Sequence, residues 1–194
     1  MSDVKEDILS SAKKHFDRFG YKKTTLDDIA RDMKISKKTI YEHFEDKEDL
    51  FVSLFIKETL SARNRIFEAI PDTMNPLEKL KAALERGVCI FSKDSFLVRV
   101  LKDDESLYSP FLTTKYHDLV EDGIITIIAD ILAEGNEKGL MRDIDEKHIA
   151  YYLFKLFQSV TYAKTTDMEV DEDTTKEIID FIFNGLVKKY DYKC

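Results

Sequence analysis

The sequence predicts an all-α protein of about nine helices, in which an N-terminal three-helix head precedes a larger helical-bundle body. Three observations support this fold class. Charged residues make up 35% of the 194 residues, which is typical of amphipathic helices with densely charged outer faces. Hydrophobic residues make up 43%, which is enough for a substantial core. The six glycines and three prolines are too few for the frequent turns of a β-sandwich or barrel.

The head begins with an amphipathic helix that starts near Val4 and ends at Gly20. Its apolar residues recur at the spacing of one helical face, and they are Val4, Ile8, Leu9, Ala12, Phe16 and Phe19. Thr25 and Asp28 then form a capping-box pattern. This pattern begins a second, short helix that extends to Met33.

The body begins with a long helix that Asp46 caps. Asn75 followed by Pro76 marks the start of the next helix, because proline is favoured at the first helical position. The remaining predicted helices cover residues 96–102, 109–138, 146–164 and 174–190. Gly139 ends the second of these, and a capping box at Thr174 begins the last.

The head differs from the rest of the chain in charge. Residues 13–47 contain ten basic and seven acidic residues, a net charge of +3. The remainder contains 20 basic and 31 acidic residues, a net charge of −11. This asymmetry favours a localised anion-binding surface on the head, with a solvated helical face as the alternative.

Two short helices joined by the turn of residues 34–36 fit a helix-turn-helix. The second of them, residues 37–44, is about 12 Å long and matches the width of the major groove of B-DNA. Ile40 and Phe44, four residues apart, are expected to face inward. Helical hairpins of this size also occur in proteins that bind no DNA, so both interpretations stay open on spacing alone.

Two late helices lack a polar face. Apolar residues surround the helix over residues 124–132, and in the one over residues 149–160 Lys155 is the only charged residue. A helix that is apolar on all sides must be buried on all sides. We therefore predict a partner subunit packed against these helices, with a single central core helix as the alternative.

The first 51 residues resemble the DNA-binding head of the tetracycline-repressor (TetR) family. The resemblance rests on ILSSA at 8–12, FGY at 19–21, TTLDDIA at 24–30 and ISKKTIYEHFEDKEDLF at 35–51. It covers about a quarter of the chain, and matches in residue type and in spacing. It implies a helix-turn-helix DNA-binding domain at residues 1–46 and a ligand-binding and dimerisation domain at residues 47–194, connected by the helix that starts at about Lys47. It also implies a homodimer formed through the last two long helices of the body.

The resemblance also implies DNA contacts at specific positions. They are Thr25, Lys37, Lys38, Thr39, Tyr41, His43 and Lys47. Contacts to phosphates are implied for Thr25, Tyr41 and His43, and Lys47 matches a lysine that holds the DNA backbone. Residues 37–39 lie where the family's recognition helix meets base edges or the flanking backbone, and lysine can indeed donate to guanine O6 and N7.

The sequence departs from the family pattern at two of the head's lysines. Lys34 stands in the turn where the family often has glycine, and a left-handed conformation there would cost about 1 kcal/mol. Lys38 stands where the family prefers a small residue, so whether Lys37 or Lys38 contacts the bases stays open.

The family encloses a small-molecule pocket between the middle helices of its body. The aromatic residues available for a pocket, each also compatible with an ordinary core, are Phe67, Phe91, Phe96, Phe111, Tyr116, Tyr152 and Phe157. The effector is expected to be largely apolar. His117 and Glu121 have the spacing of a metal-binding pair but lack a third ligand nearby, so we expect no metal ion and no cofactor.

Several other classes of protein are unlike this sequence. Cys89 and Cys194 are too few for a disulfide framework, the acidic N-terminus is unlike a signal peptide, and no apolar run has the length of a membrane span. We expect a soluble cytoplasmic protein with no membrane partner. No nucleophile–base arrangement is visible, so we expect no enzymatic activity.

These observations predict a homodimeric, sequence-specific DNA-binding transcriptional regulator, most simply a repressor released from a pseudo-palindromic operator by a small-molecule effector. An architectural or division-control DNA-binding protein without an effector is the alternative. A helical enzyme or carrier with a vestigial head is a remote third hypothesis. An apolar cavity in the body would favour the first hypothesis over the second.

Overall fold

The structure is a computed structural model that describes residues 3–91, 96–97, 100, 121–162 and 172–187. The helices within these residues are α1 (Val4–Lys23), α2 (Leu26–Met33), α3 (Lys37–Tyr41), α4 (Lys47–Phe67), α5 (Pro76–Phe91), α8 (Asp122–Glu137), α9 (Glu146–Tyr162) and α10 (Glu172–Leu186). The predicted all-α class is confirmed, with eight helices in the described residues. β pairing there is limited to one isolated bridge, between Met141 and Val187.

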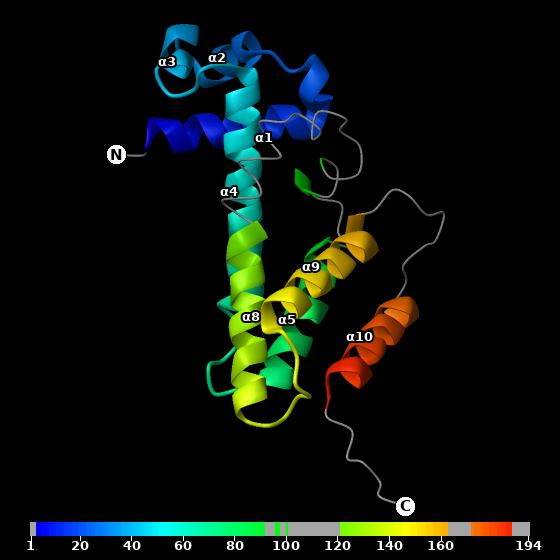
Figure 1. Cartoon of the computed structure of the whole chain (residues 1–194). Helices are drawn as coiled ribbons and strands as arrows, with labels where there is room; N and C mark the ends of the chain where they lie inside the picture. The colour runs from blue at the N-terminus through cyan, green and yellow to red at the C-terminus, as the bar shows by residue number, and fades with distance from the viewer. Residues whose placement is uncertain (1–2, 92–95, 98–99, 101–120, 163–171, 188–194) are drawn as a thin grey trace, which may run out of the picture.

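Helices α1, α2 and α3 form the head at the top of Figure 1. Gly20 interrupts α1 with a φ of 76°, a conformation that favours glycine, and this break lies where the sequence predicts the helix to end. The buried side chains of the head form one cluster with those of α4 as far as Ala62, and Phe91, Phe96, Leu97 and Val100 join it. Its most deeply buried members are Ile8, Ala12, Ile29, Ile40 and Leu50.

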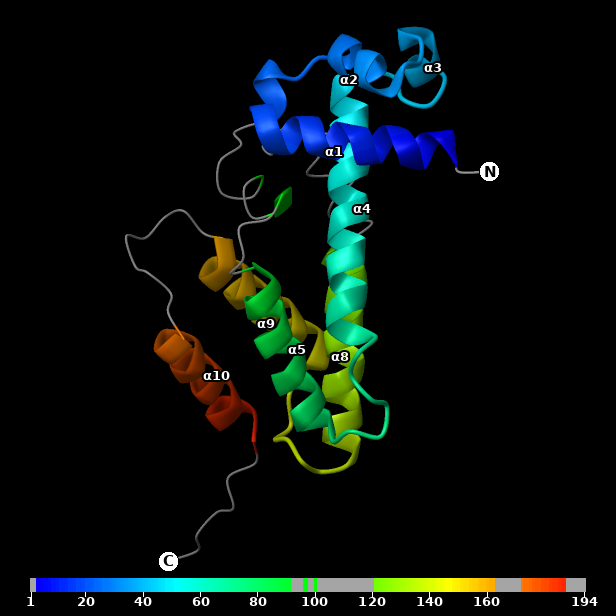
Figure 2. The same cartoon turned by 180° about the vertical axis from the view of Figure 1, so that it is seen from behind.

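Helix α4 connects the head to the body, and Figures 1 and 2 show it running from the head down alongside α8. Leu54 and Phe55 on α4 belong to the head cluster. Phe67, at the other end of α4, packs against a second cluster in the body, to which α5, α8, α9 and α10 contribute. The head's core therefore extends past residue 46 into α4, and one rigid helix contacts both cores.

Several helix ends follow the local signals in the sequence. The Asp46 carboxylate accepts a hydrogen bond from the Asp49 amide at 2.8 Å, as expected of an N-cap. The Asn75 side chain accepts one from the Leu77 amide at 2.9 Å at the start of α5. Gly139, with a φ of 65°, follows the end of α8.

Two predicted helices have wrong boundaries. The third helix ends at Tyr41 rather than Phe44, because the Ile40 carbonyl accepts from the amides of both His43 and Phe44 and the chain turns Phe44 into the core. Helix α10 covers Glu172–Leu186 rather than residues 174–190, so Thr174 lies inside it and the helix ends before Val187. Acidic residues are favourable near the positive N-terminal end of a helix dipole. The acidic pair at positions 172 and 173 therefore favours a helix that begins before the capping pattern at Thr174.

Some predictions fall outside the described residues. The predicted helix over residues 96–102 is described only at positions 96, 97 and 100. The first part of the predicted helix over residues 109–138 is likewise outside, and α8 is its described part.

Candidate nucleic-acid interface and effector cavity

The turn between α2 and α3 has the geometry of a helix-turn-helix without a glycine. Lys34 takes the left-handed conformation, with φ 56° and ψ 37°. Its amide donates to the Arg31 carbonyl at 3.2 Å, and the Ile35 amide donates to the Ala30 carbonyl at 3.0 Å. These two bonds close the C-terminus of α2, so the turn holds a conformation that costs a lysine about 1 kcal/mol.

Helix α3 is fixed at its start and on its inner face. The Ser36 hydroxyl accepts from the Thr39 amide at 3.1 Å and lies 3.0 Å from the Thr39 hydroxyl. Ile40 is fully buried against the head. The amide and the hydroxyl of Thr39 are therefore both engaged by the Ser36 cap. The exposed side chains of this region are Lys37, Lys38, Tyr41 and His43.

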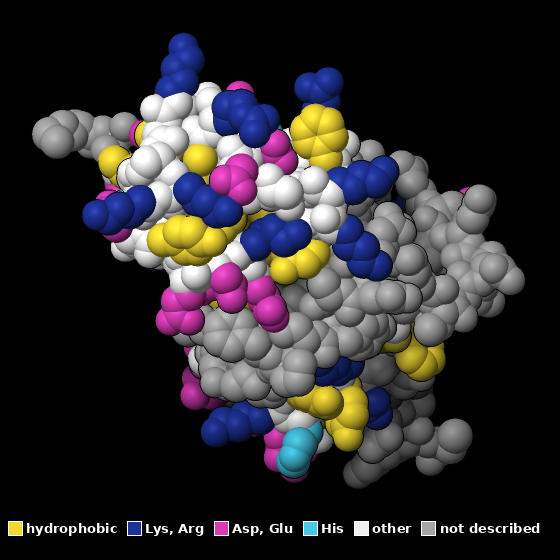
Figure 3. Space-filling view, turned by 90° about the horizontal axis from the view of Figure 1, so that it is seen from above, with side chains coloured by type: hydrophobic (Ala, Val, Ile, Leu, Met, Phe, Trp, Pro, Cys, Tyr) yellow, Lys and Arg dark blue, Asp and Glu magenta, His cyan; other side chains and the backbone are white. Residues whose placement is uncertain are grey.

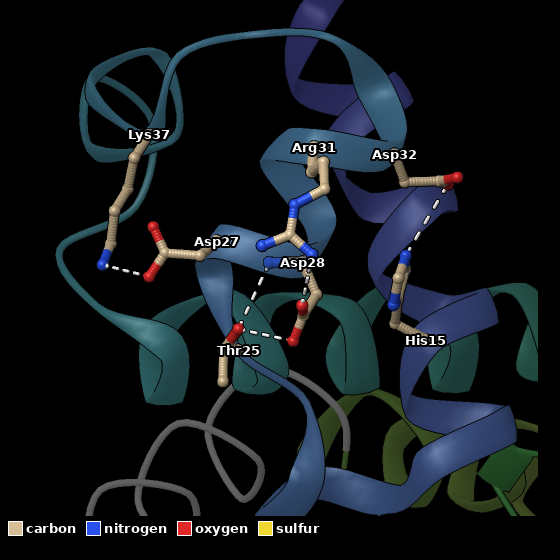
Figure 4. Close-up of polar contacts among 7 residues, drawn as sticks. All are labelled: His15, Thr25, Asp27, Asp28, Arg31, Asp32 and Lys37. Atoms are coloured by element: carbon tan, nitrogen blue, oxygen red, sulfur yellow. Dashed lines mark hydrogen bonds and ion pairs between the residues drawn. The ribbon is translucent and has the colours of Figure 1, made fainter.

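The lysines that begin α3 have different surroundings. The Lys37 ammonium donates to a carboxylate oxygen of Asp27 at 2.8 Å (Figure 4). It also lies 6.0 Å from the centre of the Tyr41 ring. The hydrogen bond to Asp27 raises the pKa of Lys37 above its ordinary value. Within the part of the chain that the structure describes, Lys38 has no ion-pair partner.

Thr25 caps α2 in the DNA-free structure. Its hydroxyl donates to Asp28 at 2.6 Å and accepts from the Asp28 amide at 3.2 Å (Figure 4). The Thr25 hydroxyl, followed by the nearby charge of Arg31, holds the pKa of Asp28 below its ordinary value. To donate to a DNA phosphate, the Thr25 hydroxyl must therefore break its hydrogen bond to the Asp28 carboxylate.

The Lys47 ammonium is held by the main chain. It donates to the carbonyl of Tyr21 at 2.9 Å and to that of Thr24 at 3.1 Å. It also lies 4.2 Å from the centre of the Tyr21 ring. Because an ammonium group has three N–H donors, one donor is left for a phosphate. Lys47 thus links the start of α4 to the C-terminal end of α1.

A second set of polar contacts links α1 to α2. His15 Nε2 lies 3.6 Å from the Asp32 carboxylate (Figure 4), and the Ser11 hydroxyl donates to the same carboxylate at 3.3 Å. Seen from above in Figure 3, many Lys and Arg side chains lie on the face that the head presents, with acidic side chains between them and along one edge. Sequence reasoning missed both Asp27 and Asp32, because spacings of 10 and 21 residues follow no local rule.

The body contains a cavity of about 60 Å³ between α4, α5, α8 and α9. Its walls are apolar apart from Thr59 and Arg63, and Arg63 is the one charged residue among the described residues that line it. The predicted pocket residues Phe67, Phe91 and Phe157 line this cavity. The rings of Phe91 and Phe157 meet edge to face, with centres 5.6 Å apart.

Two of the other predicted pocket residues lie away from this cavity. Phe96 packs in the head cluster, 6.0 Å from the ring of Phe51. Tyr152 is 64% exposed on the outer side of α9. Phe111 and Tyr116 lie outside the described residues.

Glu121 is buried in an ion pair. Its carboxylate accepts from Lys155 at 3.0 Å and from the Gln158 side chain at 3.0 Å. His117, its candidate metal-binding partner, lies outside the described residues, and the residues that are described contain no cluster of metal-binding side chains. No described helix is long and apolar enough to span a membrane.

Comparison with known proteins agrees with this geometry. Residues 8–54 match the family described as "Bacterial regulatory proteins, tetR family". The chain is 25% identical to the uncharacterized HTH-type transcriptional regulator YhgD of Bacillus subtilis (strain 168) over 186 residues, which cover 95% of this chain and 97% of YhgD.

Two solved structures share the fold. One is the transcriptional regulator FadR from Bacillus subtilis in complex with stearoyl-CoA, with a TM-score of 0.74, 20% identity, and coverage of 93% of this chain and 98% of FadR. The other is AibR in complex with isovaleryl coenzyme A and operator DNA, with a TM-score of 0.63, 17% identity, and coverage of 93% and 98%.

Proposed function

The chain belongs to the TetR family of bacterial regulatory proteins, and from this membership we propose that it is a homodimeric repressor that an acyl-CoA effector releases from a pseudo-palindromic operator. It is a ligand-responsive DNA-binding transcriptional regulator, and the proposal adds the effector, the dimer interface and the DNA contacts. The observation that carries it is the placement of an apolar cavity against α4, the helix that also enters the core of the head. A regulator working on chromosomal DNA acts in the cytoplasm.

The DNA contact is assigned to α3 and its surroundings. Lys37, Lys38 and Tyr41 form the exposed face of this helix, and residues 13–47 carry a net charge of +3. An isolated positive surface on an acidic body attracts phosphates locally while the body limits loose association with DNA. Of the two lysines, Lys38 is already free of ion pairs within the described residues, and Lys37 must first leave Asp27.

The effector is assigned to an acyl thioester by the character of the cavity. Its apolar walls suit a hydrocarbon chain, and Arg63 supplies a cation for the phosphates of coenzyme A. FadR, which shares the fold, binds stearoyl-CoA. A cavity of about 60 Å³ is far smaller than the 300–1,000 Å³ of typical ligand pockets, so an acyl chain must part the surrounding helices.

This expansion explains how binding reaches the DNA. Thr59, Arg63 and Phe67 on α4 line the cavity, and Leu54 and Phe55 on the same helix pack in the head. Parting α4 from α5 and α8 therefore moves the head relative to the body. Because a dimer contacts half-sites about 34 Å apart, a shift of a few ångströms places one recognition helix out of register.

The dimer is assigned to the outer faces of α9 and α10. Tyr152 on α9 and Phe181 on α10 are 64% and 76% exposed, an unusual exposure for large apolar side chains. A second copy covering both helices would bury them.

Two titrations test the proposal. The operator is first selected from a random pool of duplexes, and its affinity for the protein should fall about 10³-fold between 50 and 200 mM salt. Stearoyl-CoA or isovaleryl-CoA should then weaken operator binding, and free coenzyme A should have little effect. By linkage, operator must weaken acyl-CoA binding by the same factor. Salt-dependent DNA binding without a response to any acyl-CoA would favour the architectural alternative.

A further inference from the structure

A second and larger hollow lies where the body meets the head. Its volume is about 380 Å³, which falls in the range of typical ligand pockets, whereas the body cavity measures about 60 Å³. The end of α1 forms one side of it, and Phe96 and Val100 contribute from the body. Figures 1 and 2 show green fragments of residues 96–100 below the bent end of α1. We call this hollow the junction cleft.

The inner wall of the junction cleft is aromatic. The ring centre of Phe51 on α4 lies 5.1 Å from that of Phe16 and 4.8 Å from that of Tyr21. It lies 6.0 Å from that of Phe96, and all four rings line the cleft. The space in front of Gly20 is open, since a Cβ atom there would have no other atom within 4 Å. A flat aromatic ligand can therefore stack against this wall.

The rim of the junction cleft carries two cations and an exposed ring. Lys22 and Lys23 line the cleft and are exposed, and neither has an ion-pair partner among the residues that the structure describes. Asp17 is the one acidic residue in the described lining, which leaves a net charge of +1. Phe19, which is 46% exposed, also lies on this rim. The rim thus offers two ammonium groups beside an aromatic surface.

We propose that the junction cleft binds an aromatic carboxylate, which acts as a second effector apart from the acyl-CoA cavity. The ring of the ligand stacks on the aromatic wall, and its carboxylate accepts from Lys22 and Lys23 at the rim. A neutral aromatic compound would leave both ammonium groups without a counter-charge, and an aliphatic anion would lack the stacking. The binding is independent of the proposed function, whereas its effect on DNA rests on that function.

A ligand in the junction cleft reaches the DNA contacts through Tyr21. The Tyr21 ring lines the cleft, and the Lys47 ammonium lies 4.2 Å from its centre and donates to the Tyr21 carbonyl at 2.9 Å. A ligand stacked on this ring displaces it, and with it the ammonium that is proposed to contact a phosphate. The ligand's carboxylate also lowers the net charge of residues 13–47 from +3 to +2. Both effects weaken DNA binding.

The test uses 1-naphthoate as the probe and 1-naphthamide as its neutral counterpart, titrated into the full chain by calorimetry at low salt. The wild type should bind naphthoate about tenfold more tightly than naphthamide. Lys22→Gln/Lys23→Gln should lose about tenfold in affinity for naphthoate and keep its affinity for naphthamide. The matched control Lys14→Gln/Lys34→Gln removes two exposed lysines outside the cleft and should bind both compounds like the wild type.

A second pair of variants tests the ring on the rim. Phe19→Ala should weaken naphthoate and naphthamide alike by about threefold, because it removes an aromatic contact that both compounds share. Val4→Ala changes another apolar residue of α1 with nearly the same exposure, 43%, and should change neither affinity. Circular dichroism checks that each variant is folded.

The effect on DNA is measured with the selected operator. Saturating naphthoate should weaken operator binding by about threefold or more, and operator should weaken naphthoate binding by the same factor. Gly87 lines the body cavity and not the junction cleft, so Gly87→Ala should keep this response.

The outcomes are distinct. If naphthoate fails to bind, or binds the two double-lysine variants equally, the site is overturned and the proposed function stays intact. Binding that Gly87→Ala abolishes would place the probe in the body cavity and also overturns the site. Binding in the cleft with unchanged operator affinity overturns the regulatory role. A wild-type protein that binds naphthoate as expected but no duplex supports the site and overturns the proposed function.

Discussion

The ring of Phe157 fills the space that a side chain at Gly87 would need. A Cβ atom at Gly87 would lie 2.8 Å from Cε2 of Phe157, and both residues line the cavity. Replacing Gly87 by alanine should therefore push the ring into the cavity. We expect Gly87→Ala to fold, because alanine favours a helix by about 1 kcal/mol over glycine, and to bind operator normally.

The same variant should lose at least tenfold in its response to acyl-CoA, measured as the effector concentration that releases half of the operator. Gly87→Ala combined with Phe157→Leu removes the displaced ring and should restore the response. Equal responses of Gly87→Ala and the wild type would place the effector elsewhere.

The exposed apolar residues of α9 and α10 should hold the dimer together. Tyr152→Glu and Phe181→Glu place charges on the outer faces and should give folded monomers, because an unpaired carboxylate buried in an interface costs several kcal/mol. Light scattering and circular dichroism would measure mass and helicity. Val4→Glu, at an exposed apolar residue of the head, should remain a dimer.

Leu153 and Phe157 lie in the apolar stretch of residues 149–160, and replacing either by glutamate should give monomer or insoluble protein. Leu153 is buried in the body cluster and Phe157 lines the cavity, so both substitutions should disrupt the fold itself. A soluble dimer of unchanged mass for both variants would contradict this packing.

The left-handed conformation of Lys34 should be measurable as lost stability. Lys34→Gly and Lys34→Ala remove the same charge and differ mainly in their tolerance of a φ of 56°. We expect Lys34→Gly to be about 1 kcal/mol more stable than Lys34→Ala in chemical denaturation. Equal stabilities would mean that the turn changes conformation in the alanine variant.

Phosphate contacts and base contacts should separate in binding to different duplexes. Tyr41→Phe should weaken operator and random DNA by similar factors, because phosphates are alike in every sequence. Lys38→Ala and Lys37→Ala should lose more on operator, and the lysine that contacts the base should relax the preference at one base pair per half-site. Operators with single substitutions identify which lysine it is. Unchanged preference in both variants would assign base recognition to Thr39, His43 or DNA shape.

Lys47 should contribute to both stability and DNA binding. Lys47→Ala removes two hydrogen bonds to main-chain carbonyls, and we expect a loss of about 1–2 kcal/mol in the free energy of unfolding. If its third donor meets a phosphate, the salt slope of DNA binding falls by about one as well. An unchanged slope together with lower stability would restrict Lys47 to positioning the start of α4.

Features set by neighbouring residues were predictable from the sequence. Asp46 and Asn75 mark helix starts through hydrogen bonds within a few residues, and Gly20 marks a break within α1 through its backbone angles. The prediction that Thr174 begins the last helix was wrong, because the acidic pair before it also favours a helix N-terminus and the helix begins at Glu172.

Features that depend on how the helices cross could not be predicted from the sequence. The contact of Asp27 with Lys37 depends on the angle between α2 and α3, and the carbonyls that hold Lys47 lie 23 and 26 residues away. On α9, apolar residues cover the whole circumference, so no periodicity distinguishes buried Leu153 from exposed Tyr152. Phe67, Phe91 and Phe157 were predicted as pocket residues from the family resemblance and their aromatic character, and the structure places them along the cavity.

The first half of α4 has a practical consequence for building chimeric regulators. A fragment that stops at residue 46 would lack Leu50, Leu54 and Phe55, all of which are buried in the head's core. Such a fragment would expose a hydrophobic surface and aggregate. A chimera that joins this head to the body of another regulator, or this body to another head, therefore requires a junction inside α4 beyond residue 55. The residues on both sides of the junction must continue the same helical periodicity.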